Sequence, residues 1–232
     1  MEVASLDTKQ SKIDILGVAI DNITMAEAGA KVNALRENAH GGYVITPNPE
    51  IIFHSQKDPA LTALINGARI LVADGVGVVK AANILKRPLK SRVPGVELGE
   101  AILPDAAKRG DRLFIYGAKP GVAEEAGKRL AAKYPGLFIC GTADGYGKDD
   151  AALCAKITEA QPDLMFGLGG SVDIYSGMIR RAPKFWRVLN LEWFYRLACQ
   201  PKRISRFVKS MPRFFRAVRR QRKAEKKAAR KK

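Results

Sequence analysis

The chain has 232 residues, of which 47% are apolar, so it is long enough to bury one substantial core. It contains no run of 18 or more apolar residues and no apolar signal-peptide core, so we expect neither a membrane-spanning helix nor export. Three scattered cysteines and two histidines favour a reducing cytoplasm and argue against a histidine-rich metal site. The formal net charge of +17 is concentrated at one end: residues 201–232 hold 15 bases and one acid, whereas the rest holds 25 bases and 22 acids.

Short β-rich runs alternate with helical stretches through residues 1–200. Strands are predicted at residues 13–18, 42–45, 69–72, 112–116, 137–140 and 163–166. The intervening helices begin at recognisable cap and proline residues: Thr24 with Glu27, Asp58 with Pro59, Pro120, and Asp149 or Asp150. This alternation is typical of an α/β fold with a doubly wound, mostly parallel, Rossmann-like sheet.

A polar, glycine-bearing turn follows five of the predicted strands. The turns are residues 46–50, 73–77, 117–121, 141–147 and 167–171. Parallel sheets bind ligands at the carboxyl ends of their strands, where backbone N–H groups and helix N-termini favour phosphate. Each turn alone is more often an ordinary tight turn, and Asp74 has the competing interpretation of a simple helix cap.

Some nucleotide chemistries are disfavoured by motifs that the sequence lacks. It contains neither G-x-G-x-x-G nor a P-loop, which disfavours dinucleotide and ATP enzymes. It also lacks a D-x-D pair, and a metal-bound nucleotide diphosphate favours paired carboxylates. We therefore expect no cofactor and no bound metal.

The basic C-terminal segment has the pattern of an amphipathic helix. Apolar residues recur at spacings of three and four: Ile204, Phe207, Val208, Met211, Phe215 and Val218. This pattern is typical of a helix lying in an anionic membrane interface, and the alternatives are nucleic-acid binding or a solvated terminus. Pro212 is expected to kink or split the helix. We therefore predict a domain over residues 1–200, a membrane-interface helix over 201–220 and a disordered basic tail over 221–232.

A series of motifs occurs in a specific order between residues 15 and 207. The motifs are Thr46-Pro-Asn48-Pro-Glu50, Ala73-Asp74-Gly75-x-Gly77, Arg92-Val-Pro-Gly95, Asp144-Gly145-Tyr146, Gly169-Gly170-Ser-Val-Asp173, Arg181-Ala-Pro183 and Leu191-Glu-Trp-x-Tyr-Arg196. Together they resemble the WecG/TagA/CpsF family of bacterial glycosyltransferases. The resemblance implies a metal-independent, inverting transfer of a sugar, often N-acetylmannosamine or its uronic acid, from a UDP-sugar. The implied acceptor is a polyprenyl-diphosphate-linked sugar, met by a peripheral protein at the cytoplasmic face of the bacterial inner membrane.

The resemblance also implies roles for individual residues. Asp74 would be the general base that takes the proton of the acceptor hydroxyl. Thr46 and Asn48 would contact the sugar or diphosphate, and Arg92 would neutralise the diphosphate as UDP leaves. The nucleobase would be held by Tyr146, which stacks on uracil, and by Asp173, which accepts hydrogen bonds. Three arginines of the C-terminal appendage would grip the diphosphate: Arg196, Arg203 and Arg206.

One departure from the family follows Phe166. Family members carry a Leu-Gly-x-Pro-x-Gln-Glu loop, a helix and a strand at this point, including a pocket glutamine, and this chain passes directly to Gly169-Gly170. The alternative function is therefore a catalytically impaired scaffold that binds UDP-sugar or membrane. A nucleic-acid protein is disfavoured, because residues 1–200 carry a net charge of only +3 and few aromatics interleave the basic tail. The sequence is compatible with a homo-oligomer and does not determine the oligomeric state.

Overall fold

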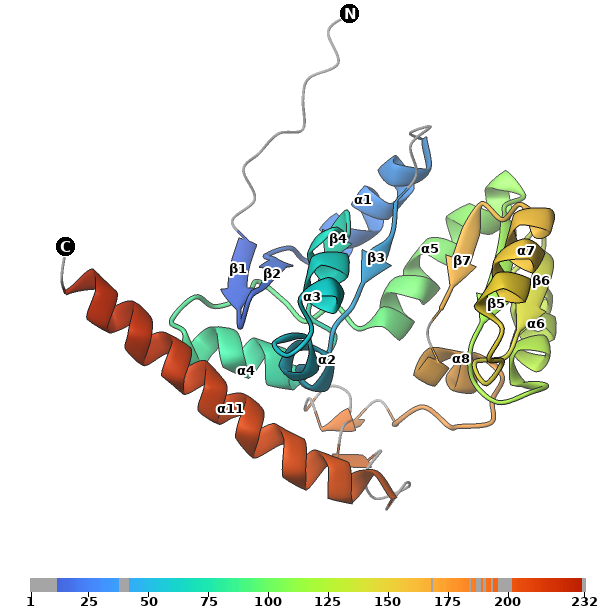
Figure 1. Ribbon diagram of the computed structural model, residues 1–232. Coiled ribbons are helices and arrows are strands. Elements are labelled where there is room, and N and C mark those ends of the chain that lie inside the picture. Colours follow the sequence, from blue (N-terminus) through green and yellow to red (C-terminus); the bar gives the residue numbers. More distant parts are fainter. Residues whose placement is uncertain are drawn as a thin grey trace, which may run out of the picture. The chain divides into compact units, whose positions relative to one another are not determined.

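The computed structural model describes residues 12–37, 42–167, 169–183, 185–186, 189, 191–192, 194–195 and 202–230. The chain divides into two compact units (Figure 1): unit 1 consists of Met1–Pro94 and Phe185–Lys232, and unit 2 is Gly95–Lys184. The division falls inside the domain predicted over residues 1–200. The C-terminal segment belongs to unit 1.

Unit 1 begins with an antiparallel hairpin where one strand was predicted over residues 13–18. Strand β1 (Lys12–Ile15) pairs with β2 (Val18–Asp21), with Ile15 opposite Val18. The two residues between them, Leu16 and Gly17, have φ values of 57° and 86°. Two consecutive positive φ angles are what a tight two-residue hairpin turn requires, and leucine seldom supplies one. The prediction of a single strand was therefore wrong.

The rest of unit 1 combines a short parallel sheet with helices. Strand β3 (Val44–Ile45) pairs with β4 (Ile70–Leu71), and the Asp21 carboxylate at the end of β2 accepts a hydrogen bond from the Leu71 N–H at 2.8 Å. The helices described before residue 95 are α1 (Met25–Glu37), α2 (Pro49–Ser55), α3 (Pro59–Asn66) and α4 (Val76–Ile84).

Two predicted helix starts are confirmed by their hydrogen bonds. At α1, the Glu27 carboxylate accepts the Thr24 N–H at 2.6 Å, and the Thr24 hydroxyl oxygen accepts the Glu27 N–H at 3.2 Å. At α3, the Asp58 carboxylate accepts the Leu61 N–H at 3.0 Å, with Pro59 in the first turn. These caps satisfy N–H groups that a helix start would otherwise leave without partners.

Unit 2 contains a three-stranded parallel sheet in the order β6-β5-β7. Its elements are α5 (Gly95–Arg109), β5 (Arg112–Tyr116), α6 (Val122–Lys133), β6 (Phe138–Ala143), α7 (Asp150–Ala160), β7 (Leu164–Phe166) and α8 (Gly169–Tyr175). Leu113, Phe114 and Ile115 of the central strand are fully buried. The α/β class is thus confirmed. Because the described strands form separate sheets of two and three parallel strands, a single doubly wound sheet stays a prediction.

The C-terminal segment forms one helix, α11 (Lys202–Ala229), which runs alongside α2 and α4 (Figure 1). Pro212 is exposed within it and does not split it, and the helix continues where disorder was predicted from residue 221. Contacts with unit 1 explain this persistence: Phe214 and Val218 are fully buried in its core. The Gln221 side chain accepts the Leu16 N–H at 3.0 Å, and the Arg222 guanidinium donates to the Ile84 carbonyl. Tertiary packing supplies what helix propensity alone does not.

Candidate functional site

The carboxyl ends of β3 and β4 lie next to each other and bring three predicted site residues together. The Val72 N–H donates to the Ile45 carbonyl at 3.1 Å, so the chain leaves both strands at the same edge. Thr46 follows directly after β3, and Asp74 stands three residues beyond β4. Two of the five polar turns that were expected to converge therefore share a strand edge in unit 1.

Asn48 and Asp74 occupy different positions relative to the helices that follow them. The side-chain Oδ1 of Asn48 accepts the Ile51 N–H at 2.9 Å and caps α2, with Pro49 at the first helical position. The N-cap of α4 is Gly75, so Asp74 stands one residue before the cap position. Asn48 thus has a clear structural role in addition to any ligand contact, whereas Asp74 is not the N-cap residue.

Arg92 joins this edge through the backbone. The Val93 N–H donates to the Ala73 carbonyl at 2.9 Å, which places Arg92 beside the turn that carries Asp74. Its side chain is 18% exposed, and its Nη1 lies 4.0 Å from Oε2 of Glu192, whose side chain is 10% exposed. The sequence analysis assigned no role to Glu192. The sequence did contain a signal that could have identified Glu192, since Glu192 is the only acidic residue among residues 185–200.

Helix α11 reaches the same region through Met211. A Cβ atom on Gly77, in the first turn of α4, would lie 3.0 Å from Cε of Met211 and 2.6 Å from Cγ of Pro49. A side chain at position 77 would therefore clash with the Pro49 ring and press on the end of the Met211 side chain, which favours glycine there. The close approach brings α11 against the N-termini of α2 and α4, next to Asn48 and Asp74.

The apolar stripe of α11 differs from the expected membrane face. Val218 is fully buried, Phe215 packs against the core of unit 1, and Met211 is partly buried. Membrane contact was predicted for Phe215, but here Phe215 and Val218 meet an apolar surface of their own chain. Membrane contact of the other stripe residues stays a prediction. Val208, 60% exposed, keeps the predicted exposure. Ile204, Phe207, Arg203 and Arg206 lie on α11 with side chains outside the described set, and Arg196 lies outside the described residues.

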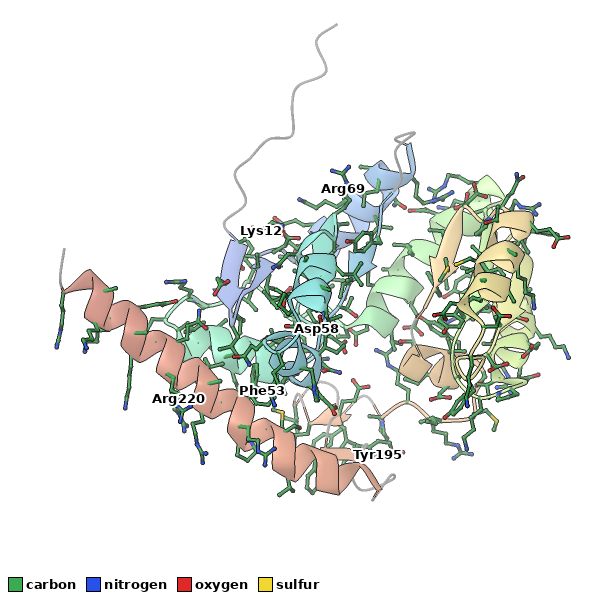
Figure 2. All side chains as sticks on the ribbon, viewed as in Figure 1. Lys12, Phe53, Asp58, Arg69, Tyr195 and Arg220 are labelled. Carbon is green, nitrogen blue, oxygen red and sulfur yellow. The ribbon has the colours of Figure 1, made fainter. Side chains whose placement is uncertain are left out.

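The opposite side of α11 is cationic. Five of the exposed bases of α11 are called the basic face here: Arg213, Arg216, Arg219, Arg220 and Lys223. Figure 2 shows Arg220 on the side of α11 that points away from α2 and α4. One side of this helix is therefore used for packing, and the other presents positive charge to solvent.

In unit 2, Tyr146 lies on an ordered turn after β6. The Asp144 carboxylate accepts the N–H groups of Tyr146 and Gly147 at 2.8 and 3.2 Å, and the Gly145 N–H donates to the Ala118 carbonyl at 2.9 Å. These bonds hold the turn against the β5–α6 connection. The Tyr146 side chain is 65% exposed. An aromatic ring presented this way is available for stacking.

Asp173 lies in α8, the helix after β7, and is partly buried. Nearby, the Tyr175 hydroxyl donates to the Val96 carbonyl at 2.9 Å, and burial raises the pKa of Tyr175 well above its usual value. This buried bond fixes α8 to α5. Asp173 and Tyr146 therefore follow the two outer strands of one parallel sheet in unit 2, whereas Thr46, Asn48, Asp74 and Arg92 gather in unit 1.

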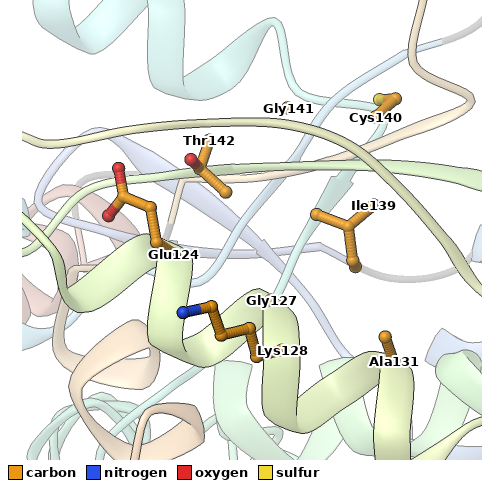
Figure 3. A pocket seen from close by; sticks show the side chains of 8 residues that line it. All are labelled: Glu124, Gly127, Lys128, Ala131, Ile139, Cys140, Gly141 and Thr142. Atoms are coloured by element: carbon orange, nitrogen blue, oxygen red, sulfur yellow. The ribbon is translucent and has the colours of Figure 1, made fainter.

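A separate groove of about 400 Å³ lies between α6 and β6 (Figure 3). It is lined by Glu124, Gly127, Lys128, Ala131, Ile139, Cys140, Gly141 and Thr142. Cys140 is the extra residue of a β-bulge, since Ile139 pairs with Leu113 and Gly141 with Phe114, and burial raises the pKa of its thiol. None of the predicted site residues lines this groove.

Two kinds of feature are absent from the described part of the chain. Within those residues, no three His, Cys, Asp or Glu side chains come together as a metal site. No helix built from them is both long and apolar enough to cross a bilayer. The 28-residue α11 is long, but its bases make it far too polar.

Comparison with known proteins matches the chain to the glycosyl transferase WecG/TagA/CpsF family over residues 13–166 and 163–228. The two matched segments overlap at residues 163–166, just before the point where the sequence predicts a missing stretch and where β7 is followed by α8. Two relatives carry the name N-acetylglucosaminyldiphosphoundecaprenol N-acetyl-beta-D-mannosaminyltransferase. The protein of Bacillus spizizenii is 34% identical over 203 residues, covering 77% of this chain and 79% of its own length. That of Staphylococcus aureus strain NCTC 8325 is 33% identical over 231 residues, covering 88% and 91%.

The matched segments include both halves of unit 1 and all the predicted site residues, from Thr46 at the end of β3 to Arg206 on α11. Such coverage goes well beyond a shared fold class, because it includes the turns and the C-terminal helix as well as the strands. This chain is accordingly a glycosyltransferase, a member of the WecG/TagA/CpsF family.

Proposed function

We propose that this enzyme transfers an N-acetylmannosamine-type sugar from a UDP-sugar to a polyprenyl-diphosphate-linked N-acetylglucosamine. The observation that carries the proposal is the meeting of Thr46, Asn48, Asp74 and Arg92 at one strand edge of a chain 34% identical to an enzyme so named. The acceptor follows from the relatives' name, and the donor nucleotide follows from the resemblance.

The chemistry assigned to this edge is a single displacement. The acceptor hydroxyl attacks the anomeric carbon while its proton passes to the Asp74 carboxylate. The bond between that carbon and the diphosphate oxygen breaks, and UDP leaves with the electron pair, so the configuration inverts. Arg92 stabilises the negative charge that develops on the diphosphate. Arg196, Arg203 and Arg206 add positive charge, which is the role that a metal ion plays in metal-dependent transferases, and the sequence contains no D-x-D motif.

Nucleobase recognition is assigned to unit 2. Tyr146 presents an exposed ring on a turn held by two hydrogen bonds to the Asp144 carboxylate and one to the Ala118 carbonyl, which suits stacking on uracil. Asp173 would accept hydrogen bonds from the base. Its place after β7, with Tyr146 after β6, supports a shared function at the carboxyl end of the sheet.

Attachment to the cytoplasmic membrane face is assigned mainly to charge. The basic face of α11 is exposed, whereas the helix buries Phe214 and Val218 within its own chain. Each base near an anionic surface contributes about 1 kcal/mol, so five bases are sufficient for a salt-sensitive attachment. Val208 and the residues that precede it on α11 are assigned the shallow insertion of the helix into the membrane interface.

The test uses the full chain with anionic vesicles that contain polyprenyl-diphosphate-linked N-acetylglucosamine. We expect release of UDP from UDP-N-acetylmannosamine, in the presence of EDTA, together with a new lipid-linked disaccharide. ADP-linked sugar is the control and should be inert. UDP binding without turnover would favour the impaired scaffold, which the stretch missing after Phe166 keeps as the alternative. Absence of UDP binding would contradict the proposed transfer and a scaffold that binds UDP-sugar, and would leave only a scaffold that binds membrane.

A further inference from the structure

Glu192 and Arg92 form a mostly buried ion pair beside the proposed catalytic edge. Their side chains are 10% and 18% exposed, and the atoms Oε2 and Nη1 are 4.0 Å apart. An ionised carboxylate is costly to bury without a compensating charge, so this pair is unlike the many surface pairs that contribute little. The pair joins residues exactly one hundred positions apart in the sequence, which makes it a tertiary feature.

The short segment that carries Glu192 is held by its own contacts. The Leu191 N–H donates to the Trp186 carbonyl at 2.8 Å, and the Tyr195 N–H donates to the Leu191 carbonyl at 3.1 Å. The Trp186 ring lies 5.9 Å from the ring of Phe194, nearly parallel to it, and 6.1 Å from that of Tyr195. This aromatic cluster fixes the backbone on both sides of Glu192, so the carboxylate is presented from a defined position.

The geometry points to Glu192 as a positioning residue for Arg92. A separation of 4.0 Å is longer than a hydrogen bond, so the contact is electrostatic. Arginine has five N–H donors in a planar fork, and an attraction at Nη1 leaves other donors to meet a phosphate. Because the carboxylate restrains a flexible side chain before the ligand arrives, less conformational entropy is lost on binding. Glu192 thereby favours binding of a nucleotide diphosphate through Arg92.

This inference rests on the proposed function, because it requires that Arg92 meets the donor diphosphate. The pair of probes is UDP and uridine, which share the base and ribose but differ in the diphosphate. Binding of each to the full chain is measured by calorimetry. Glu192→Gln removes the charge while keeping the shape of the side chain. We expect it to raise the Kd for UDP about tenfold and to leave the Kd for uridine unchanged.

Two comparisons make this specific to the ion pair. In an Arg92→Gln background, Glu192→Gln should have no further effect on UDP. Glu225→Gln is the matched control: Glu225 pairs with Arg87 at 2.9 Å in the same unit, beyond the other end of α4. It should leave both Kd values unchanged. Glu192→Asp keeps the charge with a shorter reach, and we expect about a threefold rise for UDP only. If Glu192→Gln does not fold, the Glu192→Asp variant is used to test the inference instead.

Several outcomes would overturn the inference. Unchanged UDP binding by Glu192→Gln would mean that the carboxylate has no effect on the Kd for UDP. Tighter binding would mean that the carboxylate competes with the diphosphate for Arg92. Equal losses for UDP and uridine would indicate a purely structural role, as would an equal effect of Glu225→Gln. If the unaltered protein binds uridine but not UDP, or binds neither, the proposed function fails first and the inference falls with it. If the parent protein binds UDP normally, a negative result for Glu192→Gln contradicts the inference alone and not the proposed function.

Discussion

Arg92 in unit 1 and Arg181 in unit 2 are both mostly buried beside glutamates, but they are held differently. Arg181, 17% exposed, donates to Glu97 at 2.6 Å and to Glu100 at 2.8 Å, so both ends of its fork are engaged on α5. Arg92 has one glutamate at 4.0 Å. Two close carboxylates engage both terminal nitrogens of Arg181 and make it a structural tie. One distant carboxylate restrains an arginine and leaves it able to bind an anion.

The same contrast extends to the two units. In unit 1, the turns after β3 and β4 hold partly buried polar side chains, which suits chemistry from which water is excluded. In unit 2, the turn after β6 displays an exposed ring. The comparison therefore predicts that substitutions at the unit 1 edge change turnover, whereas those at Arg181 change stability.

The largest effect is expected at Asp74. Asp74→Asn should keep the fold and UDP binding but lower the transfer rate by roughly 10²–10⁴, because asparagine cannot accept the acceptor proton. Transfer to lipid-linked acceptor is measured beside UDP binding. The control is Asp58→Asn, since Asp58 caps α3 and asparagine caps equally well. An active Asp74→Asn enzyme would assign the base to another group.

The next effect tests whether α11 belongs to unit 1. Phe214 is fully buried in the unit 1 core, so Phe214→Ala should lower the free energy of unfolding by about 3–5 kcal/mol. Urea denaturation measures the change. Val208→Ala, on the same helix at an exposed position, should stay within about 0.5 kcal/mol. A neutral Phe214→Ala would mean that the helix is not docked as described.

A free-energy change of similar size is expected when bases of the basic face are removed, and here it is the free energy of binding to anionic membranes that changes. Replacing Arg213, Arg216 and Arg220 with glutamine removes three exposed charges while leaving Phe214 and Val218 packed. At about 1 kcal/mol per charge, affinity for anionic vesicles should fall roughly a hundredfold at low salt. Vesicle sedimentation measures it. At 0.5 M salt, screening should make the parent and the variant alike; a persistent difference would argue against an electrostatic attachment.

A smaller effect is expected at Arg181. Arg181→Gln leaves Glu97 and Glu100 without their shared partner, and their partial exposure limits the loss of stability to about 1–3 kcal/mol. UDP affinity and turnover of the folded variant should stay close to those of the parent. Thermal unfolding and the transfer assay are compared with Arg92→Gln, for which we expect the opposite pattern. Loss of UDP binding at Arg181→Gln would remove the distinction between the two arginines.

The smallest effect concerns Glu27, whose pKa is lowered from 4.5 to about 2, first by the Thr24 N–H and then by Lys90. Because the pKa is lower in the folded state, the stabilisation is fully present above pH 4.5 and is lost as the pH falls toward 2. Glu27→Gln keeps a capping side chain and removes the charge. Its melting temperature should lie slightly below that of the parent at pH 7, and the difference should shrink at pH 3. A difference independent of pH would contradict this.

Local signals account for much of what was predictable. The capping box, the Asp58 cap with Pro59 and the β-rich runs each depend on neighbours within a few residues, and these predictions are confirmed at α1, α3 and β5. The turn at Leu16 and Gly17 was missed, because a leucine at positive φ is rare, and the turn is stabilised by pairing between β1 and β2 and by a hydrogen bond from the Leu16 N–H to the distant Gln221 side chain.

The sequence by itself determined the α/β class, the family, and the residues that gather after β3 and β4, since these depend on local patterns and ordered motifs. Only the tertiary structure decided what the apolar stripe of α11 touches. Periodicity shows that one helix face must leave water, but a membrane and the chain's own core satisfy it equally well. The pairing of Arg92 with Glu192 was likewise decided by packing, because nothing local connects two residues so distant in the chain.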